Sequence, residues 1–345
     1  MRPSASGSDP AHRRTIGALA FGTCFAAVIA ITLSTLLPGI STRYYLLLPG
    51  RALPIAQRIE VPAELRHEVG DLSATVVLQK QAFFPEALVR AASPGVRVVP
   101  YISVIPRGQT PDEVTESSRR QMRESQVSAA IVALRALGHR AEVTGEGVRV
   151  TGVRPGTPAA ARLKQNDIIT ALNGRAVATD VEIIEAMRAY RPGDRLSLTV
   201  RRGDDVLEQV VDTIAAPDDP NRPFVGIGIA THGYRARLPF DVRIDSRNAI
   251  GPSAGLIFAL GIYDALTPGS LTNGVRVAGT GTIAASGTVG QVDGVAQKVL
   301  GAESAGYTVF LTPRQNYAEA RRAAQNIRVI PVETFAQALD VLRGM

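Results

Sequence analysis

The chain has 345 residues, enough for two or three domains, and apolar residues make up 45% of it, which is ample for buried cores. Its net charge of +7 comes from arginines scattered among acidic residues, without a basic block interleaved with aromatic side chains, so a nucleic-acid-binding protein is not expected. The single cysteine, Cys24, excludes an intramolecular disulfide and a thiolate metal cluster, and the four histidines lack metal-ligand spacing. We therefore expect no metal and no cofactor.

The first 37 residues predict a membrane anchor. Residues 1–14 are polar and basic, and residues 15–37 form an uncharged, apolar run. At 1.5 Å per residue this run makes roughly 34 Å of helix, enough for a hydrocarbon core of about 30 Å. A cleaved signal peptide is the alternative, but its apolar region would span only ~7–15 residues and end at a small-residue site. The basic residues before the run predict a cytoplasmic N-terminus and a single-pass protein whose catalytic region lies outside the cytoplasm.

Residues 38–69 contain several prolines and are predicted to form a connector next to the membrane. A strand is expected at 72–78. A helix is expected over 111–137, with Thr110 as its N-cap, acidic residues in its first turns and Gly138 at its end.

Residues 141–216 have the pattern of a separate module. A strand at 148–153, a turn at Asn173-Gly174, a helix over 182–189 and two closing strands follow one another. Residues 217–223, rich in proline and aspartate, then read as a linker. Strands are expected at 224–230 and 240–244, before the next motif.

That motif is Gly-Pro-Ser-Ala-Gly at 251–255, which leads into a densely apolar run typical of a buried helix. At the first turn of this helix, Ser253 would meet unpaired backbone N–H groups and the positive end of the helix dipole. Gly251 and Gly255 would let another segment approach closely. These features suit a nucleophile and an oxyanion.

A serine needs a base, and Lys298 is the candidate. The chain holds three lysines, at 80, 164 and 298, against 35 arginines (38 − 3). Lys298 stands in the stretch 289–300, whose only other charge is Asp293. A desolvated lysine can lose its proton, whereas an arginine cannot. The alternative is a lysine that extends from a helix face to solvent.

Three collinear motifs carry a resemblance to a known family. They are Gly-Pro-Ser-Ala-Gly at 251–255, Val-Ala-Gly-Thr-Gly-Thr-Ile at 277–283 and Gly-Thr-Val-Gly-Gln-Val-Asp-Gly-Val-Ala-Gln-Lys at 287–298. Together they resemble the Lon peptidase domain, and the chain as a whole resembles the membrane-anchored, PDZ-containing Lon-like proteases of the YlbL family.

The resemblance implies an α+β fold in which a transmembrane helix precedes a Lon-type peptidase domain with an inserted PDZ domain. The peptidase would comprise residues 70–140 and 222–345, and the PDZ domain residues 141–216. PDZ domains bind peptides as an added strand beside a helix, with the carboxylate held by backbone N–H groups. No Gly-Leu-Gly-Phe-type loop precedes the strand at 148–153, which leaves capture of C-terminal peptides open.

By the same resemblance, Ser253 and Lys298 form a catalytic dyad, separated by 45 positions (298 − 253) as in the family. Thr280 would orient the lysine, although a threonine at a strand end also bonds backbone without a catalytic role. Backbone groups around Gly251, Pro252 and Ala254 would bind the oxyanion. Some Lon peptidases carry an aspartate three positions before the serine, where this chain has Ile250.

The resemblance further implies protein or peptide substrates and a homo-oligomeric, six-membered ring. No Gly-x4-Gly-Lys-Ser/Thr stretch occurs, so cleavage without ATP is expected. Two alternatives stay open. One is a Ser-His-Asp triad of Ser253, His232 and Asp245; the other is a membrane-anchored PDZ adaptor whose peptidase fold is inert.

Overall fold

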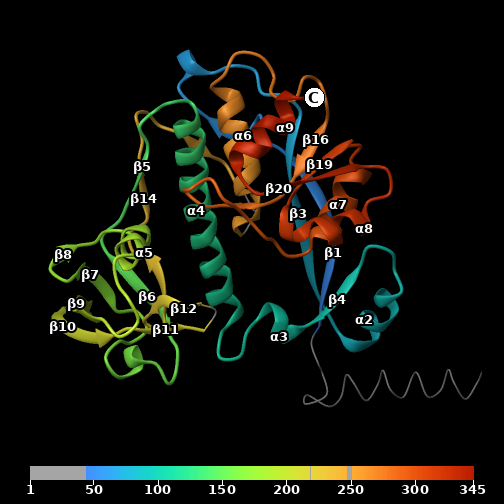
Figure 1. Ribbon diagram of the computed structural model, residues 1–345. Coiled ribbons are helices and arrows are strands. Elements are labelled where there is room, and N and C mark those ends of the chain that lie inside the picture. Colours follow the sequence, from blue (N-terminus) through green and yellow to red (C-terminus); the bar gives the residue numbers. More distant parts are fainter. Residues whose placement is uncertain (1–43, 218, 247–250) are drawn as a thin grey trace, which may run out of the picture.

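The computed structural model describes residues 44–217, 219–246 and 251–345 (Figure 1). The predicted membrane span at 15–37 lies outside these ranges. Among the residues described, no helix combines the length and the hydrophobicity needed to cross a membrane.

A six-stranded mixed sheet forms the larger part of the molecule. Its strands, in spatial order, are β20 (Arg328–Val332), β19 (Val309–Pro313), β16 (Val277–Gly279), β3 (Leu72–Ala82), β1 (Tyr44–Pro54) and β4 (Arg97–Pro100). β3, β16, β19 and β20 are parallel, whereas β1 runs antiparallel to both of its neighbours. The prediction of a connector over 38–69 is therefore wrong for β1, which pairs with β3 from Tyr44 opposite Ala82 to Pro54 opposite Ser73.

Helices cover both faces of this sheet. On one face lie α6 (Gly255–Ala265), α9 (Phe335–Arg343) and the long α4 (Pro111–Ala136), and on the other lie α7 (Val295–Ser304) and α8 (Tyr317–Ala323). Successive strand residues alternate between the two cores: Val309 and Leu311 pack with α6, and Phe310 packs with α7. Burial of the parallel strands on both faces explains why β16 and β19 are almost entirely apolar.

The predicted helices at 111–137 and after Gly255 are confirmed. Thr110 and Glu113 form a reciprocal capping box at the start of α4, and Gly138 follows its end with φ +81°. Every residue of α6 is buried, as its densely apolar sequence predicts. This includes Asp264, whose carboxylate accepts from the N–H groups of Gly70 and Leu271.

The second sheet belongs to the inserted module and lies on the far side of α4 from the first (Figure 1). Its order is β10 (Asp205–Asp212), β9 (Arg195–Arg202), β7 (Ile168–Leu172), β6 (Val148–Val153) and β13 (Ile227–Thr231), with β8 (Arg175–Ala176) beside β7. Helix α5 (Asp180–Met187) packs against the apolar cluster of this sheet through Ile183.

Two expectations for the segment after the module are wrong. Part of the predicted linker is β12 (Asp219–Phe224), which pairs with β11 (Ile214–Ala216). The strand at 227–231 does not belong to the peptidase sheet: as β13 it pairs with β6 and packs Ile227 and Ile229 on the second core. The position of this strand after the predicted linker suggested a peptidase strand. Instead β6 offers the strand edge with which β13 pairs, and the second core offers the apolar face on which its isoleucines pack.

Short antiparallel pairs of strands lie outside the two sheets. β5 (Glu142–Thr144) pairs with β14 (Arg235–Arg237) where the chain enters and leaves the inserted module, and β2 (Ile59–Glu60) pairs with β15 (Arg243–Ile244). A further pair, β17 (Thr282–Ile283) and β18 (Val289–Gly290), follows β16. The remaining helices are α2 (Phe84–Ala91) and α3 (Tyr101–Val104), with 3₁₀ turns at Ala63–Leu65, Pro158–Ala161, Pro252–Ala254 and Arg314–Asn316.

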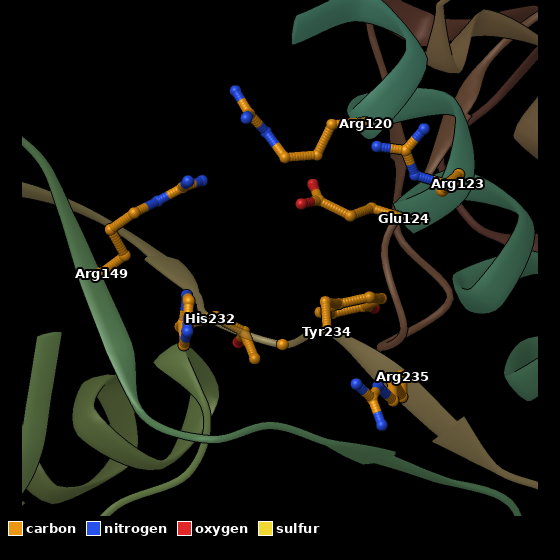
Figure 2. Close-up of a pocket in the computed structure, with 9 residues that line it drawn as sticks. Arg120, Arg123, Glu124, Arg149, His232, Tyr234 and Arg235 are labelled. Atoms are coloured by element: carbon orange, nitrogen blue, oxygen red, sulfur yellow. The ribbon is translucent and has the colours of Figure 1, made fainter. Parts of the chain in front are cut away.

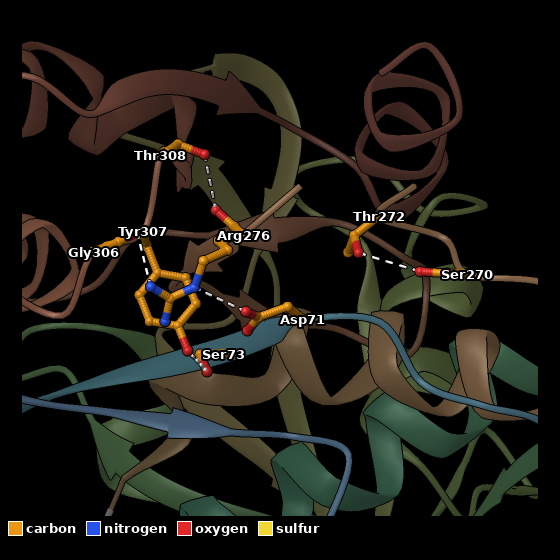
Figure 3. Close-up of polar contacts among 8 residues, drawn as sticks. All are labelled: Asp71, Ser73, Ser270, Thr272, Arg276, Gly306, Tyr307 and Thr308. Atoms are coloured by element: carbon orange, nitrogen blue, oxygen red, sulfur yellow. Dashed lines mark hydrogen bonds and ion pairs between the residues drawn. The ribbon is translucent and has the colours of Figure 1, made fainter. Parts of the chain in front are cut away.

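Side-chain contacts fasten the amino ends of the parallel strands (Figure 3). Arg276, just before β16, pairs with Asp71, just before β3, at 2.9 Å and donates to the carbonyl of Gly306 at 3.1 Å. Its guanidinium also lies 4.7 Å from the ring centroid of Tyr307, whose hydroxyl bonds Ser73. The carboxyl ends of the same strands are left for the site described below.

The β5–β14 pair closes the insertion, which gives a testable boundary. Thr144 lies opposite Arg235, so we expect that residues 146–233 can be replaced by a two-residue Asn-Gly turn with the peptidase sheet still folded. Removing only 147–212 should instead leave β13 without β6, exposing its two isoleucines and causing aggregation. Gel filtration and thermal unfolding of both deletions test this, and a better-behaved 147–212 deletion would place the boundary elsewhere.

Candidate active site

Ser253 lies in a short turn at the start of α6. The turn, η3 (Pro252–Ala254), follows Gly251, whose φ of +102° favours glycine. The hydroxyl of Ser125 on α4 donates to the carbonyl of Pro252 at 3.0 Å. A side chain at position 255 would place Cβ 2.4 Å from that hydroxyl oxygen, so the predicted close approach is confirmed at Gly255. At Gly251 no atom of the described residues lies within 4 Å of such a Cβ, and the backbone angle accounts for the glycine.

Lys298 lies on the opposite face of the sheet, in α7. Its side chain is 3% exposed, among apolar neighbours that include Val295 and Val299. Burial lowers the pKa of Lys298 to about 8, against the opposing charge of Asp293. The alternative of a lysine that reaches solvent is therefore wrong.

Thr280 connects the two faces. Nζ of Lys298 donates to Thr280 Oγ1 at 3.0 Å, and Thr280 Oγ1 donates to the carbonyl oxygen of Ser253 at 2.9 Å. The N–H of Gly281 donates to the same carbonyl at 2.8 Å, and the N–H of Leu256 donates back to Gly281 at 3.0 Å. The serine turn is thereby tied to the segment that the lysine reaches.

This arrangement lies at the carboxyl end of β16. Thr280 directly follows that strand, α6 begins on one side of it, and α7 packs against it from the other. Open sheets of parallel strands commonly place ligands at this edge, where chain segments from both faces converge. The topology thus links Lys298 through Thr280 to the backbone of Ser253, which lies 45 positions earlier in the sequence (298 − 253).

Some predicted contacts are not seen. Within the described residues, the hydrogen bond of Lys298 Nζ goes to Thr280 and not to the Ser253 hydroxyl. Ile250 lies outside the described residues. His232 lines a separate pocket between α4 and the second sheet, and neither Ser253 nor Asp245 lines it (Figure 2).

One segment at the edge of the second sheet was not expected from the sequence. The sequence just before β6 contains no Gly-Leu-Gly-Phe-type loop for binding a carboxylate. The edge strand of the second sheet is β13, which comes after the rest of the module in sequence. It is preceded by Phe224-Val225-Gly226, in which Gly226 has φ +91° and its carbonyl accepts from the N–H of Arg154. The aromatic-apolar-glycine-isoleucine pattern at 224–227 was the available signal, and its position after the presumed linker concealed it.

Comparison with known proteins agrees with both parts of the structure. Residues 135–213 match the family described as PDZ domain, and residues 241–343 match the Lon protease (S16) C-terminal proteolytic domain. These matches support a PDZ-containing Lon-like protease.

Among curated proteins, the chain is similar to Lon protease 2 of Bacillus subtilis, with 33% identity over 104 residues, 29% of this chain and 18% of that protein. It is also similar to the Lon protease of Clostridium beijerinckii, with 29% identity over 184 residues, 51% of this chain and 21% of that protein. The chain spans 11–21% of the length of the curated relatives it matches.

Among solved structures, the PDZ domain of an SdrC-like protein from Listeria monocytogenes is 28% identical to the chain, with a TM-score of 0.24. The match covers 26% of this chain and 92% of that one.

Proposed function

We propose that the chain is a serine endopeptidase that cleaves exposed or unfolded protein segments through a Ser253–Lys298 dyad, without ATP. The observation that carries this proposal is a buried lysine of lowered pKa, linked through Thr280 to the turn that holds the serine. A structural lysine gains nothing from such burial, because desolvating its charge is costly. This cost argues against the inert adaptor.

The hydrogen-bond directions indicate how Thr280 orients the base. The hydroxyl hydrogen of Thr280 is engaged with the carbonyl of Ser253, so its oxygen can only accept from Nζ. A neutral amine that donates to Thr280 keeps its lone pair free for the proton of the Ser253 hydroxyl. Thr280 therefore serves as a positioning residue for the lysine.

The reaction then follows the steps of acyl transfer. Ser253 Oγ attacks the peptide carbonyl while Lys298 takes the hydroxyl proton. The backbone N–H groups of Gly251, Ser253 and Ala254 stabilise the oxyanion, and Pro252, in the same turn, has no N–H to contribute. Lys298 returns the proton to the leaving amine, which releases the first product. Water, deprotonated by the same amine, hydrolyses the acyl-enzyme and restores the serine.

The direct test is hydrolysis of an unfolded protein such as casein by the purified chain in detergent, without ATP. The wild-type chain should release peptides and Ser253→Ala should not. Intact casein after prolonged incubation with the wild-type chain, or equal hydrolysis by Ser253→Ala, would exclude the proposed activity.

The lysine pKa predicts a pH dependence. With a pKa of about 8, burial leaves Lys298 mostly protonated at pH 7 and mostly neutral at pH 9. Because only the neutral amine accepts a proton, kcat/KM should rise roughly tenfold from pH 7 to pH 9 and then level off. A profile measured on a short peptide substrate tests this, and a rate that is flat between pH 7 and 9 would contradict lysine as the base.

We propose that one helix over 15–37 tethers the protein to the membrane, with the catalytic region outside the cytoplasm. The described chain starts at Tyr44, whose ring lies 6.2 Å from that of Phe84. There α2 and the residue before it expose four apolar side chains, between 49% and 73%: Phe83, Phe84, Leu88 and Val89. Only six residues separate the apolar run from Tyr44, so this face would lie against the bilayer.

Protease added to intact cells should digest the region after residue 40 while a tag on residue 1 stays protected. Recovery of a soluble form that begins near residue 38 would overturn the tether.

We further propose that the PDZ domain captures peptides and that the peptidase works as a homo-oligomeric ring. The unpaired edge of β13 beside α5 supports the first part, and the resemblance to Lon peptidases supports the second. Mass measurement of the detergent-solubilised chain tests the ring, and a monomer under conditions of full activity would contradict it.

A further inference from the structure

The edge of β13 that lies beside α5 is a site where an extended peptide can add as a further strand. Among the residues described, β13 pairs only with β6, so its other edge is unpaired. Helix α5 lies beside that edge: the N–H of Asp180, at the start of α5, donates to Thr231 Oγ1 at 3.0 Å. α5 also exposes Val181 and Ile184, by 48% and 52%, which are apolar contacts available to a peptide. β-Strand addition between these two elements is the expected binding mode.

Gly226, just before β13, determines the orientation of a peptide bound along this strand. Gly226, in the backbone conformation that can present N–H groups to a carboxylate, stands at the start of β13. A peptide held there by its C-terminal carboxylate, and antiparallel to β13, runs toward Thr231. The five residues of β13 span about 17 Å at roughly 3.3 Å per residue, so the fifth to seventh residue from the peptide's C-terminus reaches the far end of the strand.

A basic pocket lies at that far end (Figure 2). It has a volume of about 310 Å³ and lies between α4 and the strands β6 and β13. Four arginines line it: Arg120 and Arg123 of α4, Arg149 of β6 and Arg235 of β14.

Two of these arginines are already paired. Arg123 pairs with Glu116 at 3.2 Å, and Arg235 pairs with Glu146 at 3.6 Å. For Arg120 and Arg149, no carboxylate in the part of the chain that the structure describes lies within 4.0 Å.

The pocket's own carboxylate does not neutralise this charge. Glu124 lies between Arg120 and Arg149 (Figure 2), and burial raises the pKa of Glu124 against the attraction of these arginines. Asp180 also faces the region, but its carboxylate accepts from the Thr231 hydroxyl at 2.7 Å and from the N–H of Val181. Two half-buried guanidinium groups against one carboxylate leave a net positive charge that a second carboxylate can satisfy.

We propose that this pocket is a specificity site for an acidic side chain, five to seven residues before the C-terminus of the peptide that adds to β13. The inference rests on the proposed peptide capture by the PDZ domain. Arg149 comes from the PDZ sheet and Arg120 from the peptidase helix α4, so an acidic residue bound by both links the docked peptide to the peptidase part. The preferred substrates or partners are thus proteins with an acidic residue five to seven positions before the C-terminus.

Fluorescent ten-residue peptides with an apolar C-terminal residue test the proposal. One glutamate is moved through positions three to eight from the C-terminus, with glutamine at the same position as the matched peptide. Binding is measured by anisotropy to the full chain in detergent, in the Ser253→Ala background so that no peptide is cleaved. We expect glutamate to bind about tenfold more tightly than glutamine at positions five to seven only, because a hydrogen bond between two charged groups is stronger than one to a neutral amide.

Variants of Arg120, whose side chain hydrogen-bonds only the hydroxyl of Ser117 among the described residues, and of Arg149 complete the test. Arg120→Gln and Arg149→Gln should remove the preference for glutamate while the glutamine peptides still bind, and Arg149→Glu should transfer the preference to a lysine peptide. Arg119→Gln, on the same helix but outside the pocket, is the matched control and should change nothing. Gain of lysine binding by Arg149→Glu also shows that the variant is folded.

The outcomes separate the two proposals. Equal binding of glutamate and glutamine peptides at every position would overturn the acidic site and leave peptide capture standing. If no peptide of the series binds, capture and the acidic site both fail, whereas casein hydrolysis still decides the endopeptidase.

Discussion

Replacing Lys298 with arginine is expected to reduce peptide-bond hydrolysis at least about a thousandfold, although the charge and much of the side-chain length remain. The guanidinium of arginine cannot release its proton, so it cannot take the one from Ser253. It must also remain charged at a position that is 3% exposed, where lysine can become neutral. The double variant with Ser253→Ala should be no less active than either single variant, because the two residues act as one unit.

Lys80→Arg is the matched control, since Lys80 is exposed and pairs with Glu86 on the surface. It should keep wild-type turnover of casein. Near wild-type turnover by Lys298→Arg, combined with loss of activity in His232→Ala, would replace the lysine with a histidine-based mechanism.

Gly301→Ala is expected to be the most disruptive single-methyl change near the site. A Cβ at position 301 would lie 2.3 Å from the carbonyl oxygen of Gly50 in β1, a backbone atom that cannot rotate away. Either α7 or β1 must move, at a cost of roughly 3 kcal/mol. For a protein of this size we expect the midpoint of peptidase unfolding to fall by roughly 6–12 °C. Since α7 carries Lys298, a shift of about 1 Å should also lower activity roughly a hundredfold at temperatures where the fold persists.

Gly152→Ala serves as the control, because no atom lies within 4 Å of a Cβ at that position and its φ is not in the left-handed region. Calorimetry and casein hydrolysis should show little change. If Gly301→Ala matched this control, the close packing of α7 on β1 would not be what positions the lysine.

Helix ends and helix burial could be predicted from the sequence, because they depend on residues that are close together in the chain. The capping box at Thr110, the end of α4 at Gly138 and the densely apolar α6 follow from side chains within a few positions of one another. The candidate residues could also be named from the sequence. A lysine in a stretch whose only other charge is Asp293, within an arginine-rich chain, is unusual enough to be noticed before the structure is known. Its burial was a prediction from chemistry, and the structure agrees with it.

The tertiary structure alone decided where distant strands pair. β1 looked like a connector because Pro49, Gly50 and Pro54 interrupt it, yet β3 accommodates them with a shift in register between Pro49 and Ala52. β13 looked like a peptidase strand because it follows a proline-rich stretch. Strand pairing depends on which edge is free and which apolar face is open, and neither property is local in sequence. For the same reason, only the fold could place Arg120 and Arg149, from two different domains, at the end of the edge that a peptide would follow.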